Sequence, residues 1–290
     1  MLISAIIPSF NSQDKLVRLL DSLSNLSNPH NDSYEIIVVD DCSTDNTRMA
    51  VENYSVNYIR LNKNSGPAVC RNIGAGAAKG DVFAFTDSDC RVDRNWLENI
   101  AGHFKDNGID AVMGKLIIDN SSFLGDSISA LGFPAGGSIG FDKVWKVDKN
   151  GFTDSLSTCN CAIRRDAFKR VGGFNVTFPY AGGEDSFLAY SLKQTGSKIK
   201  YCADVIVHHE ARDSLKDYIS WQFKRGLSSY LFSSKVKNKY DYMSLRLWSI
   251  SNVIKNNLTD KKLPLVLFLL ITGYFTQMFG FLYGKVKEKN

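Results

Sequence analysis

Asp81-Val82-Phe83-Ala84-Phe85-Thr86-Asp87-Ser88-Asp89 joins an apolar run of strand length to two carboxylates that stand one residue apart. The run has the length and composition of a buried strand. A strand that ends in Asp-Ser-Asp places hard oxygen ligands at a sheet edge, where a divalent cation and a phosphorylated ligand can bind together. Taken alone, Asp-x-Asp is more typical of an acidic turn, because turns favour Asp and Ser. The rest of the chain has to decide between these interpretations.

Apolar runs of the same kind come before this stretch, at residues 3–8, 34–39 and 56–61. Helical patterns separate them: leucines recur at helical spacing over 16–23, and Gly66-Pro67 begins a small-residue helix that continues to Ala78. Strands that alternate with helices over about the first 110 residues predict an α/β fold with a mostly parallel, doubly wound sheet in this part of the chain.

In such a sheet the carboxyl ends of the strands meet at one edge, where ligands bind. Three strand ends carry polar motifs, Pro8-Ser9-Phe10, Asp40-Asp41 and Asp87-Ser88-Asp89. Several carboxylates gathered at one edge repel one another and raise each other's pKa unless a cation balances them. The motifs therefore predict a bound metal ion.

The second half of the chain is less regular. Residues 120–150 are rich in Gly, Ser and Phe, which indicates a mobile loop region over a pocket. A strand is expected over 158–163, a helix begins after Gly182-Gly183-Glu184-Asp185, and an apolar run over 199–207 ends in His208-His209. These residues add two acids and two histidines to the candidate site.

Five motifs in this order resemble the family 2 glycosyltransferases, which are inverting enzymes with the glycosyltransferase A fold. The resemblance covers about residues 1–230. It rests on Ile7-Pro8-Ser9-Phe10-Asn11, Val38-Val39-Asp40-Asp41-Cys42-Ser43-Thr44-Asp45, Asn64-Ser65-Gly66-Pro67-Ala68-Val69-Cys70-Arg71-Asn72-Ile73-Gly74, Asp87-Ser88-Asp89 and Gly183-Glu184-Asp185.

For the sugar-nucleotide donor, the resemblance implies a cleft made by the strand ends. Its donor-binding residues are Pro8, Ser9, Phe10, Asp40, Asp41, Arg71, Asp87 and Ser88. Asp40 is expected to accept a hydrogen bond from the base, with Asp41 as the weaker candidate. Arg71 is expected beside the diphosphate.

For the metal and the reaction, the resemblance implies Mn²⁺ or Mg²⁺ held by Asp87, Asp89 and His208, with His209 left open as the alternative ligand. Asp185 corresponds to the catalytic base. Glu184, Gln222 and Arg225 are candidates for the acceptor side. Gly226 stands where the processive synthases of the family carry Trp, which favours transfer of a single sugar or a few.

The C-terminal part differs in composition from the rest. The chain has 290 residues and a formal charge of +5, but residues 235–290 carry ten Lys and Arg against three acids, so the rest is slightly acidic. Residues 263–283 contain no charge and are long enough for a membrane helix. This pattern favours anionic lipid over nucleic acid as a partner. We expect a catalytic domain over 1–232, with a nucleotide-binding half (1–115) and an acceptor half (116–232), and a helical membrane-association tail over 233–290.

The N-terminus begins directly with a strand and has no secretory signal, and the six cysteines include no Cys-x-x-Cys pair, so free thiols in the cytoplasm are expected. Together these features predict a membrane-associated, inverting glycosyltransferase at the cytoplasmic face of the cell membrane. We expect it to transfer a sugar from a UDP-linked donor to a hydroxyl of a glycan or lipid-linked acceptor in cell-surface polysaccharide or glycolipid synthesis. The alternatives are a nucleotidyltransferase and a non-catalytic, membrane-tethered nucleotide-sugar binding protein.

Overall fold

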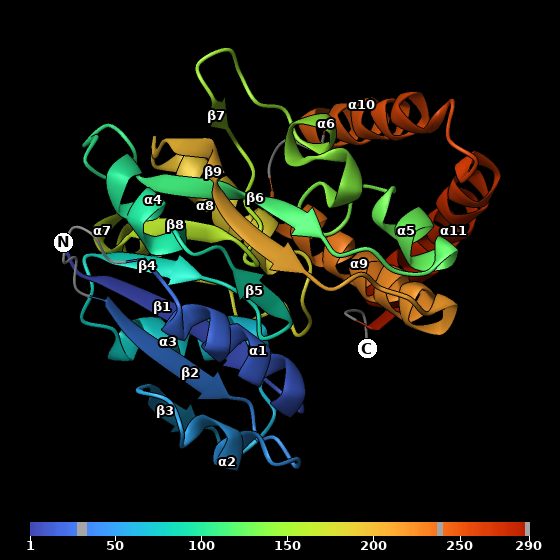
Figure 1. Ribbon diagram of the computed structural model, residues 1–290. Coiled ribbons are helices and arrows are strands. Elements are labelled where there is room, and N and C mark those ends of the chain that lie inside the picture. The colour runs from blue at the N-terminus through green and yellow to red at the C-terminus, as the bar shows by residue number, and fades with distance from the viewer. Residues whose placement is uncertain (28–33, 237–239, 288–290) are drawn as a thin grey trace.

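The computed structural model describes residues 1–27, 34–236 and 240–287 (Figure 1). A nine-stranded sheet forms its centre, in the order β3-β2-β1-β4-β8-β6-β9-β5, with β7 paired to β9. The sheet with its flanking helices is the predicted α/β fold. Residues 237–239 and 288–290 of the predicted tail lie outside the described residues.

The strands are β1 Ile3–Ser9, β2 Tyr34–Asp40, β3 Asn57–Arg60, β4 Val82–Phe85, β5 Cys90–Val92, β6 Ala111–Ile118, β7 Phe152–Thr153, β8 Cys161–Arg164 and β9 Ile199–His209. The helices are α1 Gln13–Ser24, α2 Thr47–Val51, α3 Pro67–Ala77, α4 Trp96–His103, α5 Phe123–Ser129, the short 3₁₀ helix η1 Gly137–Ile139, α6 Phe141–Val144, α7 Arg165–Arg170, α8 Glu184–Gln194, α9 Leu215–Lys235, α10 Tyr240–Asn257 and α11 Leu263–Lys287.

The first four strands form the predicted parallel part of the sheet. β1 pairs in parallel with β2 and β4, and β2 pairs in parallel with β3. Ser9 lies opposite Asp40, so the polar ends of β1 and β2 are neighbours. Helix α3 packs so closely on this sheet that a Cβ at Gly74 would lie 2.5 Å from Ile6 Cγ2. This close packing explains the small residues of α3.

The other part of the sheet mixes strand directions. β8 runs antiparallel to both β4 and β6, and β5 and β7 run antiparallel to β9, whereas β6 and β9 are parallel. The mostly parallel sheet predicted for about the first 110 residues is thus confirmed by β1 to β4, whereas the strand directions of the second half were not predicted. The sequence patterns did not predict β5 or β6. The expectation of an irregular region over 120–150 is wrong for 123–129 and 141–144, which are helical.

An irregularity interrupts the pairing of β6 with β9. Gly114 lies opposite Cys202, but the next residue, Lys115, lies opposite Ile206, so β9 carries three extra residues. Asn160 bridges this bulge, because its Nδ2 donates to the carbonyls of Lys115 (2.8 Å) and Val205 (2.9 Å). Since three is odd, the residues beyond the bulge point to the opposite faces from those of an unbroken strand.

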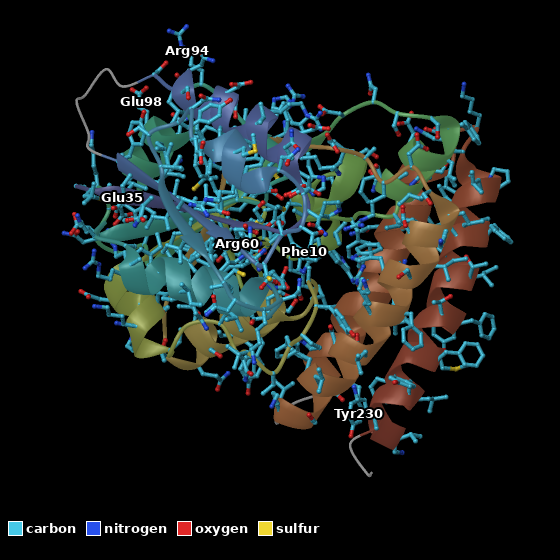
Figure 2. All side chains as sticks on the ribbon, turned by 90° about the horizontal axis from the view of Figure 1, so that it is seen from below. Phe10, Glu35, Arg60, Arg94, Glu98 and Tyr230 are labelled. Atoms are coloured by element: carbon cyan, nitrogen blue, oxygen red, sulfur yellow. The ribbon has the colours of Figure 1, made fainter. Side chains whose placement is uncertain are left out.

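Helix α11 packs along α9 through glycines. A Cβ at Gly226 would lie 2.1 Å from the carbonyl oxygen of Gln277, and one at Gly280 would lie 2.1 Å from that of Phe223. Figure 2 shows the two helices side by side, with side chains projecting from the outer face of α11. Exposed residues on that face include Phe268, Ile271, Tyr274, Phe275, Phe279 and Leu282.

Among the described residues, α11 is the one helix long and apolar enough to cross a membrane. The predicted boundary at residue 232 falls within α9, and the division into catalytic domain and tail stays a prediction. All six cysteines are free, in agreement with the expectation of unpaired thiols.

Candidate active site

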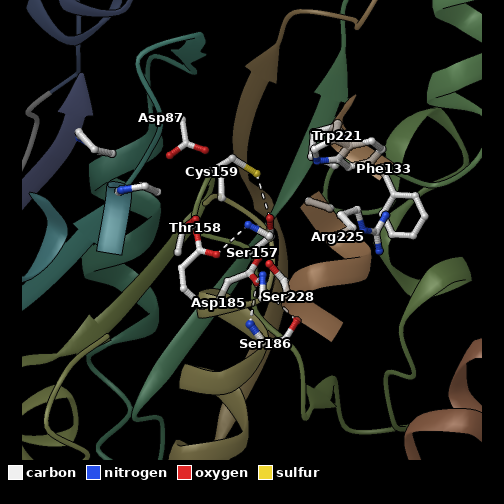
Figure 3. Close-up of a pocket in the computed structure, with 18 of the residues that line it drawn as sticks. Asp87, Phe133, Ser157, Thr158, Cys159, Asp185, Ser186, Trp221, Arg225 and Ser228 are labelled. Carbon is white, nitrogen blue, oxygen red and sulfur yellow. Dashed lines mark hydrogen bonds between the residues drawn. The ribbon is translucent and has the colours of Figure 1, made fainter. Parts of the chain in front are cut away.

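A cavity of about 360 Å³ lies at the carboxyl ends of β1 and β4, beside the first turn of α8. We define its sheet wall as Asp41, Arg71, Asp87, Asp89 and His209, and its helical wall as Phe133, Arg212, Trp221, Arg225 and Ser228. Figure 3 shows Asp185 in the view between Asp87 and Arg225. The predicted sheet edge thus forms one wall of a pocket.

Arg71 joins the end of β4 to the start of α8. Its guanidinium is buried, with Nη2 2.6 Å from Asp87 Oδ1 and Nη1 3.0 Å from Glu184 Oε1. Burial alone lowers the pKa of Arg71, but the two carboxylates outweigh it and the pKa is raised. Arg71 therefore stays charged, and it holds Asp87 and Glu184, which are far apart in the sequence, in one cluster.

Glycines bring the acids of α8 into the pocket. Gly182 and Gly183 have φ values of +106° and +137°, which only glycine adopts readily. A Cβ at Gly183 would lie 2.8 Å from Ser228 Cβ, so glycine also allows α8 to approach α9. Asp185 Oδ1 accepts hydrogen bonds from the amides of Ser186 (2.7 Å) and Gly183 (3.2 Å).

Both acids at the start of α8 are weaker acids than usual. Burial raises the pKa of Glu184 to about 7, aided by the charge of Asp185 and opposed by Arg71. Burial also raises the pKa of Asp185, although the amides of Ser186 and Gly183 and the charges of Arg71 and Arg225 act against it. A carboxylate with a raised pKa is a better proton acceptor, which is what a general base requires.

The two histidines of β9 point to different faces. His209 is buried, lines the pocket and has its Nε2 3.4 Å from Asp89 Oδ1. His208 lies outside the pocket lining, with its Nδ1 3.8 Å from Asp119. Neighbouring strand residues point to opposite sides of a sheet. The structure therefore brings His209 to the site and does not bring His208 there.

The two neighbouring acids at the end of β2, Asp40 and Asp41, also differ in whether they face the pocket. Asp40 is fully buried and lies outside the pocket lining, and its carboxylate accepts hydrogen bonds from the amide of Ser43 (2.8 Å) and the side chains of Tyr58 and Arg60. Asp41 lines the pocket, and its carboxylate accepts hydrogen bonds from the backbone amides of Ser65 and Gly66. Asp41, the weaker candidate for the hydrogen bond with the nucleotide base, is thus the residue that faces the pocket.

The remaining predicted donor residues meet at the pocket. Pro8, Ser9, Phe10 and Ser88 all line it, and Phe10 is 48% exposed. The label of Phe10 in Figure 2 marks this position near the centre of the view.

Of the three candidates for the acceptor side, Arg225 and Glu184 line the pocket and Gln222 does not. Arg225 lines the pocket, with its guanidinium carbon 3.7 Å from the ring centre of Phe133 and 4.9 Å from that of Trp221. Glu184 also lines it, but its carboxylate is bonded to Arg71 and to the Gly182 amide. Gln222 lies outside this pocket, and its Oε1 accepts from Gln277 Nε2 on α11 (2.6 Å). Gln222 thus connects two helices.

Arg212 is a pocket residue that the motifs did not reveal. It lines the pocket with its guanidinium carbon 4.8 Å from the ring centre of Trp221. Within residues 1–27, 34–236 and 240–287, its Nε has no hydrogen-bond partner and no ion pair holds its guanidinium. Burial lowers its pKa, and the charges of Asp89, Asp217 and Asp87 oppose this. The sequence signal was an Arg soon after the strand end that carries the histidines.

The carboxylates of Asp87 and Asp89 and the imidazole of His209 are suitable donors for Mn²⁺ or Mg²⁺. Asp89 and His209 also belong to a compact group with Cys90. Burial raises the pKa of the Cys90 thiol well above its usual value, so this side chain stays protonated and is a poor ligand. The residues present therefore fit a hard divalent cation held by oxygen and nitrogen.

Comparison with known structures identifies the fold. The chain is similar over 99% of its length to the mannosyltransferase PcManGT from Pyrobaculum calidifontis in complex with GDP-Man and Mn²⁺, with a TM-score of 0.62, 19% identity and 86% of that chain covered. It is also similar over its full length to residues 1–349 of S. aureus TarS in complex with UDP, with a TM-score of 0.59, 18% identity and 92% of that chain covered. These likenesses confirm the glycosyltransferase A fold.

Sequence comparison gives the relatives. The chain is 28% identical over 222 residues, 75% of its length, to the pre-mycofactocin glycosyltransferase of Mycobacterium tuberculosis, and spans 44% of that protein. It is 26% identical over 77% of its length to the glycosyltransferase AglE of Haloferax volcanii, of which it covers 71%. The model of the Glycosyl transferase family 2 matches residues 4–172, more than half of the chain. The chain therefore belongs to glycosyltransferase family 2.

Proposed function

We propose that the protein is an inverting glycosyltransferase that moves one sugar from a nucleoside diphosphate sugar, most simply UDP-linked, to an acceptor hydroxyl. The observation that carries this proposal is the cluster in which Arg71 joins Asp87 to Glu184, next to Asp185, in one pocket. The cluster places metal-binding acids and a candidate base within one cavity.

The donor takes the sheet wall in this proposal. Pro8, Ser9, Phe10 and Asp41 border the nucleoside. Asp87, Asp89 and His209 would hold a divalent metal ion, which would supply positive charge for the leaving diphosphate. Arg71 already has two carboxylate partners, so Arg212 is the arginine with donors available for the diphosphate.

Asp185 is the base. It takes the proton of the acceptor hydroxyl while that oxygen bonds to the anomeric carbon, and the bond from this carbon to the diphosphate breaks with its electron pair leaving on the diphosphate. Because attack and departure occur on opposite faces, one displacement inverts the anomeric configuration. Glu184 keeps Arg71 and Asp87 in position.

The exposed apolar face of α11, with lysines 285 and 287 near its end, suits attachment to an anionic membrane surface. Among the relatives, TarS is named a poly(ribitol-phosphate) β-N-acetylglucosaminyltransferase, and the chain is 34% identical to it over 121 residues, 40% of its length. This likeness supports a role in cell-surface glycan synthesis at the cytoplasmic face of the membrane, with a glycan or lipid-linked acceptor.

The test is nucleotide release from a panel of UDP, GDP and dTDP sugars, with Mn²⁺, with Mg²⁺ and with a chelator. We expect one donor class to release nucleotide only when metal is present, and release to increase when a membrane lipid extract is added. Absence of release from every donor in the presence of metal would overturn the proposal.

A further inference from the structure

A second cavity lies behind the helical wall of the active site. It has a volume of about 150 Å³ and lies between α9, α10, α11 and residues 131–145. We call it the rear cavity. Its apolar lining includes Leu131, Val144, Leu245, Ile250, Val253 and Leu270. Polar residues line it as well, but Gln277 bonds to both Arg246 and Gln222, so these side chains bind one another. The apolar part of the lining favours a hydrocarbon chain over a sugar or a nucleotide.

The rear cavity adjoins the catalytic pocket. Four residues, Phe133, Trp145, Ser186 and Arg225, line both cavities. Ser186 directly follows the candidate base Asp185, and Arg225 lies against the ring of Phe133 at the junction. These four side chains thus stand between the two cavities, and a ligand that extends from one to the other has to pass them.

The rear cavity also reaches the apolar outer surface. Tyr274 of α11 and Ile250 of α10 line it and are 61% and 39% exposed. Tyr274 belongs to the same outer face of α11 as Ile271 and Phe275, which are exposed as well. An apolar chain that lies in a membrane next to this face has a short route into the cavity.

We propose that the rear cavity binds the hydrocarbon chain of the acceptor, and that the acceptor is a sugar joined to this chain through phosphate. Arg225, at the junction of the two cavities, faces the phosphate, and the sugar hydroxyl lies at Asp185. This inference rests on the proposed function and narrows its acceptor from a glycan or a lipid-linked sugar to the latter.

Binding can be tested without knowledge of the acceptor sugar. Farnesyl phosphate and methyl phosphate share a head group and differ in the chain, so equilibrium dialysis of both against the full-length protein isolates the contribution of the chain. We expect farnesyl phosphate to bind at least tenfold more tightly. Equal affinity for the two probes would overturn the proposal.

A pair of variants on α10 locates the chain. Ser249 lines the rear cavity and not the catalytic pocket, so Ser249→Trp fills the rear cavity only. Leu247 lies on the same helix, is 66% exposed and lines neither cavity, so Leu247→Trp is the matched control. Ser249→Trp should remove the preference for farnesyl phosphate, and Leu247→Trp should keep it.

Other results of this experiment are also informative. If Ser249→Trp keeps the full preference, the chain binds at the outer face of α11 and the proposal fails. Donor nucleotide affinity should be unchanged in both variants, which shows that they are folded. If no donor releases nucleotide but Ser249→Trp removes the preference for farnesyl phosphate, the proposed function is wrong and the assignment of the rear cavity as a site for a hydrocarbon chain is supported.

Discussion

The two walls of the active site hold their charges by different means. On the sheet wall, Arg71 is fixed between the carboxylates of Asp87 and Glu184, and strand pairing sets the positions of the strand ends. On the helical wall, Arg212 and Arg225 lie against aromatic rings. Two carboxylates fix an arginine by ion pairs, whereas an aromatic ring attracts it through a cation–π contact. This difference teaches that ion pairs hold the charge of the sheet wall, and that the packing of arginine on aromatic rings holds the charge of the helical wall.

The largest expected effect concerns Asp185, where the two walls meet. Asp185→Asn should lower transfer by about 10³-fold, because the amide cannot take the proton of the acceptor hydroxyl. Donor nucleotide affinity should stay within about threefold, as measured by calorimetry. Asp166→Asn is the matched control, since Asp166 is also an acid in a helix first turn but is exposed and distant from the pocket. Full activity of Asp185→Asn would refute the assignment of the base.

The next effect tests the metal ligand on the sheet wall. His209→Ala should raise the metal concentration needed for half-maximal activity about 10- to 100-fold, because a ligand is lost. His208→Ala should change it less than about twofold, since His208 points to the other face of β9. Metal titrations of both variants check this prediction, and the reverse order of effects would restore His208 as the ligand.

The third effect is a dependence on pH that arises from the sheet wall. Glu184 pairs with Arg71 only when it is ionised, and its pKa is raised to about 7. Acidification from pH 8 to pH 6 should therefore lower transfer about tenfold, because Glu184 takes up a proton and its ion pair with Arg71, which also holds Asp87, is lost. The Glu184→Gln variant should show a lower but flatter profile over this range. An unchanged rate at pH 6 would contradict this role.

The smallest effect on the rate of transfer is expected from glycine substitutions in the helices behind the two walls, which should change the stability of the protein. Gly280→Ala places a Cβ 2.1 Å from the carbonyl oxygen of Phe223, so it should lower the free energy of unfolding by about 1–3 kcal/mol. Gly76→Ala, in α3 beside the sheet wall, meets nothing within 4 Å and should raise it by about 0.5–1 kcal/mol. Thermal melts of both variants measure these changes. Equal stabilities would show that α9 and α11 do not need the close approach.

Much of the sheet wall could be predicted from the sequence, because Asp41, Asp87, Asp89 and His209 end or follow strands that apolar residues make recognisable. Arg71 and Asp185 lie on helices and were predicted from the resemblance to the family, and both line the pocket. Errors arose where a choice depended on one step along the chain. Asp40 and Asp41, like His208 and His209, are neighbours, and composition cannot show which member of a pair faces the pocket.

The helical wall could be predicted less well. Arg212, Trp221 and Phe133 converge through the packing of α9 against residues 131–145, and no spacing in the sequence encodes that contact. Gln222 carried a motif-like signal but serves to join α9 to α11. No direction was predicted for the strands of the second half of the sheet, where β5 and β8 are only three and four residues long.

The bulge in β9 at residues 203–205 has a consequence for how the site can evolve. Ile206 to His209 pair residue by residue with Lys115 to Ile118, so this pairing fixes the face to which each histidine points. A one-residue insertion or deletion that the bulge absorbs would leave His209 beside Asp89. The bulge thus separates the length of the chain before the histidines from the direction in which they point.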